Sequence, residues 1–205
     1  IIRTDFALPD GSFTLFLDDE ALSTVANINA ENAYVYGTAA NLKVDFNNAW
    51  RFQTNINWTR GRRSIPYENR EVEVPLAHIP PLYGRAALRY QLGKWQIEGV
   101  CRFQGEKPVE EYAVTSISPE STGNNLIFNR VGSSDNLDET PLCEDGTYCL
   151  GTPAWTTYNL YAQYNFGSIS TRLGFENIFD VHYRPFASGV SAPGRNLVVS
   201  VSGRF

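Results

Sequence analysis

Residues 49–60, AWRFQTNINWTR, alternate between apolar and polar side chains along most of their length. Because successive side chains of a β-strand point to opposite faces, one face would carry Trp50, Phe52, Thr54, Ile56 and Trp58. The other face would carry Arg51, Gln53, Asn55, Asn57 and Thr59. A half-buried strand of a soluble protein has this pattern, and so does a strand of a membrane β-barrel.

The same period of two recurs along the chain, and no helical periodicity of comparable length competes with it. It marks residues 33–46, 49–60, 83–92, 94–104, 154–166, 168–178 and 195–205. Most of these segments run about ten to thirteen residues, whereas strands of soluble proteins usually run about five or six. About eleven residues, tilted by about 45°, rise about 26 Å, close to the roughly 25 Å apolar band of outer-membrane barrels.

The connections between these segments alternate strictly between short and long. Those after Phe46, Leu92 and Phe166 have one or two residues, whereas residues 5–32, 61–82, 105–153 and 179–194 form long connections. Outer-membrane barrels have short periplasmic turns and long extracellular loops. Aromatic residues gather beside the short turns, as in an interfacial girdle: Phe46, Trp50, Trp95, Tyr164 and Phe166. We therefore predict an all-β, antiparallel, up-and-down transmembrane β-barrel, with a soluble β protein as the alternative.

Composition excludes several other classes of protein. The net charge of −5 over 205 residues argues against a nucleic-acid groove. No phosphate-binding loop or nucleophile elbow is present, and neither histidine lies beside a serine on the same strand face. We expect no enzymatic activity, no cofactor and no metal site. The chain opens at Ile1 without a methionine or signal segment, which indicates a processed or partial chain.

The three cysteines suggest one local crosslink. Cys143 and Cys149 bracket the acidic segment CEDGTYC, and a disulfide there would close a surface loop in an oxidising compartment. Free thiols or a metal site are the alternatives, although no histidine or further cysteine lies nearby to complete tetrahedral ligation. Cys101 has no obvious partner and is expected to act as a small apolar side chain.

The last third of the chain carries an ordered set of motifs. A strand with the sequence NIFD is followed by a tyrosine, by a loop containing PGRN and by a final strand that ends in phenylalanine. The residues are Asn177, Ile178, Phe179, Asp180, Tyr183, Pro193, Gly194, Arg195, Asn196 and Phe205. This set resembles the C-terminal end of TonB-dependent outer-membrane receptors, in particular those of Bacteroidetes-type Gram-negative bacteria. NAENAYVYGTAANL, RGR at 60–62 and IPPLYGRAALRY are further similar elements.

The resemblance implies a barrel of about 22 strands that encloses a plug domain. Such receptors import a scarce nutrient, such as a ferric siderophore, haem, cobalamin, another metal complex or a glycan, with energy supplied by TonB. We expect residues 1–205 to form about seven C-terminal strands of the barrel, without the plug. The remaining strands and the plug would come from the same or another chain, because open strand edges are not tolerated in lipid.

Two other functions stay open at this point. The chain could line a passive porin-like channel, or it could complete a multi-chain outer-membrane assembly, which a surface lipoprotein could cap. The resemblance also implies assembly by the barrel-assembly machinery, for which Phe205 would be part of the C-terminal signal. Asn177 and Asp180 are expected to end a strand and to bond the following loop, because both residue types favour turns.

Ligand contacts in such receptors come from the extracellular loops and the plug. The candidates here are Arg62, Arg63, Arg70, Tyr112, Arg130, Tyr148 and His182. The arginines, together with Arg60, could attract an anionic siderophore or a lipopolysaccharide phosphate, or could pair with nearby glutamates at the barrel rim. An acidic group at residues 135–145 is expected to be a solvated surface, with a calcium site as the alternative.

Overall fold

The computed structural model describes residues 2–5, 14–17, 20–23, 25–28, 32–117, 121, 126, 128–130, 151–188 and 190–204. The chain divides into two compact units, residues 1–34 with 62–74 and residues 35–61 with 75–205. Within the described part, no helix is both long enough and apolar enough to span a membrane.

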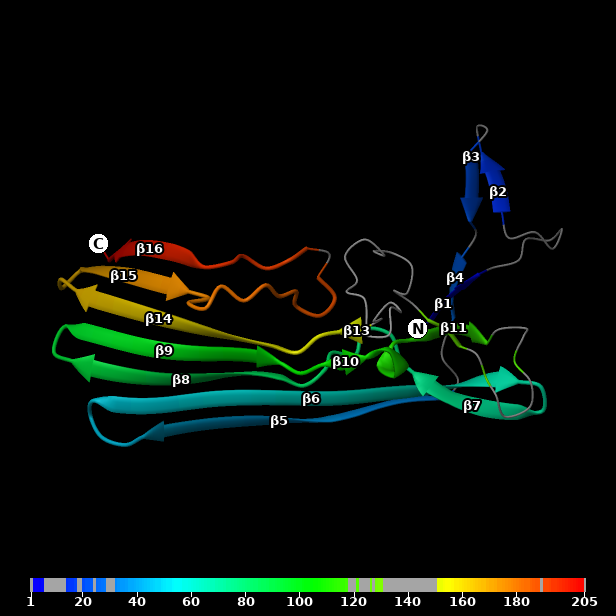
Figure 1. Ribbon diagram of the computed structural model, residues 1–205, viewed down its shortest axis with the longest axis horizontal. Helices are drawn as coiled ribbons and strands as arrows, with labels where there is room; N and C mark the ends of the chain where they lie inside the picture. The colour runs from blue at the N-terminus through cyan, green and yellow to red at the C-terminus, as the bar shows by residue number, and fades with distance from the viewer. Residues whose placement is uncertain are drawn as a thin grey trace. The chain divides into compact units, whose positions relative to one another are not determined.

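The main sheet runs in the order β16-β15-β14-β9-β8-β6-β5 (Figure 1). Its strands are β5 (Ala33–Asp45), β6 (Trp50–Tyr67), β8 (Tyr83–Leu92), β9 (Trp95–Gln104), β14 (Trp155–Asn165), β15 (Ile169–Glu176) and β16 (Asn196–Gly203). Apart from β7 (Arg70–Pro75), which pairs with β6 off this path, strands that follow one another in this set are neighbours in the sheet. The predicted antiparallel up-and-down fold is therefore confirmed for the part of the barrel wall that this chain contains, and the sheet is not closed on itself.

Tight turns join the strands in pairs at one end of the sheet, on the left in Figure 1. Gly93 and Gly167 have φ values of +55° and +93°, which glycine adopts without steric cost. In the β5–β6 turn the side-chain oxygen of Asn47 accepts hydrogen bonds from the backbone N–H groups of Ala49 and Trp50, at 2.8 and 2.9 Å. The connections after β9 and β15 leave from the opposite end.

The register of the strands separates the side chains onto two faces. Directly paired positions share a face, so the cross-strand pairs can be followed from strand to strand across the sheet. One such row consists of Trp50, Tyr90, Ile97, Ala162, Leu173 and Val199. The adjacent row, on the other face, consists of Arg51, Arg89, Glu98, Tyr161, Gly174 and Val198. The alternation in the sequence is thus preserved from β6 to β16, and we call the two sides the apolar face and the polar face.

Burial on the two faces is the reverse of that in a soluble protein. The buried cluster of the sheet, Ala87, Val100 and Tyr161, belongs to the polar face. On the apolar face, by contrast, Leu88 is 43% exposed and Leu160 is 48% exposed. Large aliphatic side chains are normally the first to be buried, so the apolar face requires an apolar medium.

The first unit contains short pairs of strands. β1 (Ile2–Asp5) pairs with β4 (Val25–Ile28), β2 (Thr14–Leu17) pairs with β3 (Glu20–Ser23), and β7 pairs with β6. The sequence placed residues 5–32 and 61–82 in long connections and ended the second strand at residue 60. That placement was wrong in both segments, because strands lie within them and β6 continues to Tyr67. The sequence of β7 has the alternation of a strand, because Glu71, Val72, Glu73 and Val74 are charged and apolar in turn. Val74 is 1% exposed.

Part of the long connection after β9 is also ordered into short elements. β10 (Lys107–Pro108) pairs with β13 (Gly151–Thr152), and β11 (Val114–Ile117) pairs with β12 (Phe128–Arg130). A single 3₁₀ turn, η1 (Val109–Glu111), follows β10. These elements place Lys107 and Tyr112 beside the ends of β9 and β14.

Candidate functional site

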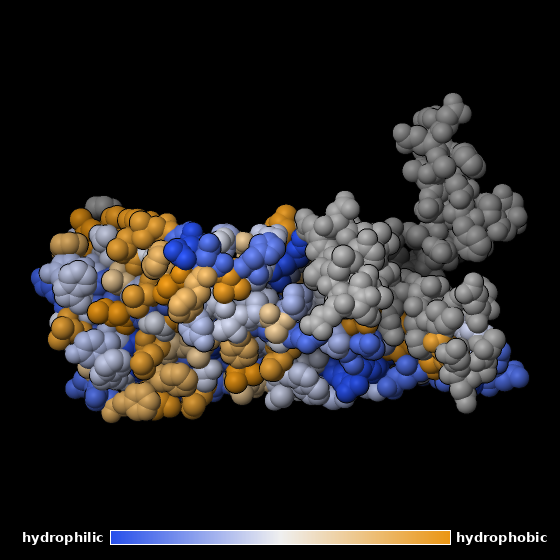
Figure 2. Space-filling view, in the orientation of Figure 1, coloured by the Kyte–Doolittle hydropathy of each residue, from blue (hydrophilic) through white to orange (hydrophobic). Residues whose placement is uncertain are grey.

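The apolar face is bordered by aromatic pairs near both ends of the strands. Near the tight turns, Trp50 packs on Tyr90 with ring centroids 4.5 Å apart, and Trp95 packs on Tyr164 at 4.7 Å. Towards the opposite end, the pairs Tyr36–Trp58 and Tyr158–Phe179 both have centroids 5.6 Å apart. Figure 2 shows hydrophobic residues gathered over the strands between these ends. An apolar band between two aromatic borders is the arrangement of a transmembrane barrel wall.

The polar face carries a charge network centred on a buried carboxylate. Glu98 of β9 is 4% exposed, and three guanidinium groups approach it from β8 and β15. The terminal nitrogens of Arg85 and Arg89 lie 3.4 Å from its Oε1, and that of Arg172 lies 3.5 Å from its Oε2. A buried carboxylate requires such partners, because an unpaired charge away from water is costly. We call these four residues the Glu98 network.

Tyr161 connects this network to β15. Its hydroxyl donates a hydrogen bond of 2.7 Å to Glu176, and the guanidinium carbon of Arg172 lies 4.1 Å from its ring centroid. The ring covers Gly174, where an added Cβ would lie 2.7 Å from a ring carbon. A glycine at this cross-strand position therefore lets the tyrosine lie flat against the sheet and support the arginine.

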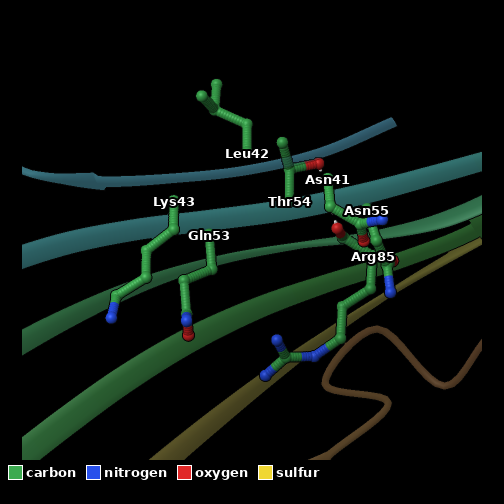
Figure 3. A pocket seen from close by; sticks show the side chains of 7 residues that line it. All are labelled: Asn41, Leu42, Lys43, Gln53, Thr54, Asn55 and Arg85. Atoms are coloured by element: carbon green, nitrogen blue, oxygen red, sulfur yellow. Dashed lines mark hydrogen bonds between the residues drawn. The ribbon is translucent and has the colours of Figure 1, made fainter. Parts of the chain in front are cut away.

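A hollow opens on the polar face beside the Glu98 network, with a volume of about 300 Å³. Its lining residues are Asn41, Leu42, Lys43, Gln53, Thr54, Asn55 and Arg85. In Figure 3 Lys43, Gln53, Asn55 and Arg85 project to one side of the strands, whereas Leu42 stands on the other side. The functional groups facing this hollow are thus two cations and several amides.

A second hollow, of about 340 Å³, lies on the same face near the tight turns. Here Arg51 of β6 pairs with Asp45 of β5, so its positive charge is compensated within the chain. Arg89, Gln91 and Gln96 also line this hollow. The polar face therefore offers charged and amide groups along its length rather than at one point.

The end of the sheet opposite the tight turns contains a buried cation that the sequence did not single out. Lys107 is 4% exposed, its ammonium group donates to the carbonyl of Ile79, and it lies 4.4 Å from the Phe186 ring centroid and 5.3 Å from that of Tyr112. The Tyr112 hydroxyl is hydrogen-bonded to Thr152. Tyr112, predicted as a ligand contact, thus lies in a packed cluster. The only sequence signal for Lys107 was its place just after a predicted strand.

The NIFD motif forms the turn that ends β15. Asn177 has φ +47° and is 3% exposed; its side chain accepts a bond of 2.9 Å from the Val181 N–H and donates bonds of 2.8 and 3.3 Å to the carbonyls of Val181 and Pro193. Its own N–H donates to the side-chain oxygen of Asn159 at 3.0 Å. Asparagine tolerates this left-handed conformation better than most residues. The motif therefore anchors the returning loop to β14.

The PGRN motif is hydrogen-bonded to the last residue of the NIFD motif. Asp180, with φ +56°, accepts a hydrogen bond of 2.7 Å from the Arg195 N–H, and a Cβ at Gly194 would lie 2.7 Å from the same carboxylate oxygen. Asn196 begins β16 and donates to the Gly194 carbonyl at 3.3 Å. Elsewhere in the loop, Tyr183 stacks on Trp155 with centroids 4.3 Å apart. In this structure the NIFD and PGRN residues therefore fix the backbone of the connection between β15 and β16, and Tyr183 packs its ring on Trp155.

The arginines predicted to attract an anion contact several different side chains. Arg60 belongs to the second unit and lies 3.7 Å from Glu111. In the first unit Arg62 is 7% exposed and 4.0 Å from Glu73, and the Arg70 guanidinium lies 5.8 Å from the Tyr67 ring centroid. Burial lowers the pKa of the Arg63 guanidinium below its ordinary value. Arg60 and Arg62 thus have carboxylate partners, which is the rim-pairing alternative.

Of the other predicted positions, the structure describes the side chains of His182 and Cys101. His182 is exposed, and its Nε2 lies 3.1 Å from the Ser191 hydroxyl. The side chain of Arg130, the residues Tyr148 and Phe205, the acidic group at 135–145 and the proposed disulfide between Cys143 and Cys149 lie outside the described residues. Within the described part, Cys101 is a free cysteine, and no group of three or more potential metal-ligating residues occurs.

Solved structures of other proteins share this arrangement of strands. The chain is similar to "Copper transporter OprC", with 16% identity over 90% of this chain and 25% of that chain, and a TM-score of 0.59. It is also similar to a mutant of the ferric enterobactin receptor PfeA from Pseudomonas aeruginosa, with 15% identity, 90% and 24% coverage and a TM-score of 0.51. The chain thus spans about a quarter of the length of these proteins, and at such identities the similarity shows the fold.

Sequence comparison with protein families is more specific. No curated protein matches the chain significantly. The family model described as "TonB dependent receptor-like, beta-barrel" matches residues 2–178, which is most of the chain. The match begins in the first unit and extends through β15 into the NIFD motif, so it covers the Glu98 network and most of both faces of the sheet. The chain belongs to the family of TonB-dependent receptor β-barrels.

Proposed function

We propose that this chain forms part of the wall of an outer-membrane receptor that imports a scarce nutrient with energy supplied through TonB. One observation carries the proposal: seven adjacent strands present an aromatic-bordered apolar face on one side and a buried charge network on the other. A wall between hydrocarbon and an aqueous lumen has these two faces. Family membership supplies the class of transport receptor.

The proposed partners follow from the edges of the sheet. β5 and β16 end the path of paired strands, and open edges in a bilayer would leave backbone groups without hydrogen-bond partners. We therefore propose that further barrel strands, from the same or another chain, close the wall. The polar face would then surround the plug domain that contacts TonB, and the barrel-assembly machinery would insert the whole protein into the membrane.

The cargo is proposed at the level of a class. A ferric siderophore, haem, cobalamin, another metal complex or a glycan would suit an energised receptor, because each is too large or too scarce for efficient passive diffusion. The test is growth of a strain that lacks the complete gene, with ferric citrate, a ferric catecholate, haem or cobalamin as the sole source of the limiting nutrient. We expect growth to fail on one source and to return with the intact gene.

Removal of TonB separates this proposal from its main alternative. A passive channel would have the same two-faced wall, but transport through it would not depend on TonB. We expect the intact gene to restore growth only when TonB is present. Restoration without TonB would favour the passive channel, whereas co-purification of a second barrel-forming chain or a lipoprotein would favour a multi-chain assembly.

A further inference from the structure

We propose that the hollow lined by Asn41, Lys43, Gln53, Asn55 and Arg85 binds a small oxyanion, such as a carboxylate or phosphate group of a solute in the lumen. The inference rests on the proposed function in one respect, because it takes the polar face to be the lumen side of the wall. It goes beyond that function by assigning a ligand chemistry to a position within the barrel wall.

The groups around the hollow are almost all hydrogen-bond donors or can act as donors. An ammonium group and a guanidinium group have no acceptor, and each side-chain amide offers two N–H groups. Lys43 and Arg85 supply the charge, while Gln53 and Asn55 face the same space (Figure 3). No carboxylate occurs among the seven lining residues. Charge-assisted hydrogen bonds to an oxyanion are the strongest contacts that this set can make.

The adjacent Glu98 network contains more positive than negative charge. Among the described residues, Glu98 is the carboxylate within 4.0 Å of Arg85, Arg89 and Arg172, so one negative charge faces three positive charges. Arg102 pairs directly with Arg85 across β8 and β9, which adds a fourth positive charge to the same face. Like charges at directly opposed positions repel each other. An anion in the hollow would relieve this repulsion through Arg85.

The size and anchoring of the site favour a small solute. The volume of about 300 Å³ is at the lower end of the range for small-molecule pockets. The hydroxyl of Thr54 donates a 3.0 Å hydrogen bond to the backbone carbonyl of Arg85, so a side-chain contact as well as the strand pairing fixes β6 against β8 beneath the hollow. Arg85 is also held towards Glu98 at 3.4 Å. The main cation is thus partly pre-organised, which lowers the cost of binding.

The test uses the complete receptor that contains this chain, purified in detergent. Crystals soaked in selenate should show an anomalous selenium peak between Lys43 and Arg85, and calorimetric titration with malonate should give saturable binding. Replacement of Arg85 by glutamine should abolish the peak and weaken malonate binding by about tenfold or more, because a charge-assisted contact is lost. Arg51→Gln removes the same charge but leaves the hollow intact, so binding should persist.

Folding defects are controlled by Lys43→Gln, because Lys43 is exposed on β5, and it should also weaken malonate binding. The proposal is wrong if selenate gives no peak, if Arg51→Gln abolishes binding as fully as Arg85→Gln, or if another segment of the protein fills the hollow. Oxyanion binding and transport are measured separately. Malonate binding by a receptor that restores no TonB-dependent growth would count against the proposed function alone, and TonB-dependent growth without malonate binding would count against this site alone.

Discussion

The two faces of the main sheet share one backbone but differ in which side chains are buried. On the polar face Ala87 is buried, Tyr161 is buried beneath the Arg172 guanidinium, and Glu98 is almost fully buried. On the apolar face, Leu160 and Leu173 remain about half exposed, although their neighbours are also apolar. The polar face thus finds many of its ion-pair and hydrogen-bond partners within the chain, whereas the large side chains of the apolar face stay exposed.

This difference identifies what stabilises each face. Burial of apolar surface contributes roughly 25 cal/mol per Å², so a large exposed apolar face in water would be unfavourable. Hydrocarbon removes this cost without any partner side chain. The polar face instead depends on specific hydrogen bonds and ion pairs, whose loss leaves buried charges uncompensated. Substitutions should therefore act through the medium on one face and through individual partners on the other.

The largest expected effect comes from a charge on the apolar face. Ile56 and Asn55 are adjacent in β6 and both exposed, but they point to opposite faces. Ile56→Arg should lower the stability of the inserted barrel by up to about 2–4 kcal/mol, with less effect near the interface. Asn55→Arg should assemble almost normally. Heat-modifiable migration of the full-length protein in membrane fractions measures this, and equal assembly of both variants would contradict the assignment of faces.

A smaller effect is expected from removing the central carboxylate. Glu98→Gln leaves three arginines without their shared partner and should reduce the free energy of unfolding by about 2 kcal/mol, less than for a fully buried pair because the arginines are partly exposed. Urea unfolding of the full-length protein in detergent measures the change. Glu106→Gln, at an exposed position outside the main sheet, is the control and should stay within about 0.5 kcal/mol of the wild type.

Fluorescence compares the two faces with little perturbation. Trp50, Trp58 and Trp95 lie on the apolar face, whereas Trp155 pairs with Gln104 and stacks on Tyr183. In variants that retain one of these tryptophans, brominated lipids should quench the first three and should quench Trp155 much less. Equal quenching of Trp155 would mean that the polar face is also in contact with lipid.

Much of the fold could be predicted because one physical rule governs the long strands. Side chains in a strand alternate, so each of the seven apolar-polar segments specified which residues share a face before any pairing was known. The alternation of residues 94–104 and 168–178 puts Glu98 and Arg172 opposite the apolar side chains, and in the structure both lie on the polar face. Their contact across β14 depends on register and on the length of the arginine side chain, which alternation alone does not give.

The extension of β6 and the surroundings of Lys107 show where the alternation of side chains no longer predicts the structure. Beyond the hydrocarbon both faces of a strand can be wetted, so the charged residues Arg60, Arg62 and Arg63 gave no reason to continue β6. Lys107 is buried by Phe186, which arrives from a loop almost eighty positions away in the sequence. No local pattern predicts such an encounter, and a lysine in a loop would ordinarily be assigned to solvent.

The strand order also has a consequence for how quickly the wall can form. The β8–β9 and β14–β15 hairpins each close over a tight glycine-containing turn, so their ends meet after very short chain excursions. The β9–β14 ladder instead joins Gln104 to Trp155 across the longest connection between neighbouring strands of the sheet. Loop-closure entropy makes such a contact slower to reach. Pairing of β9 with β14 should therefore be the slowest step in forming this wall, and a folding catalyst would accelerate this step most.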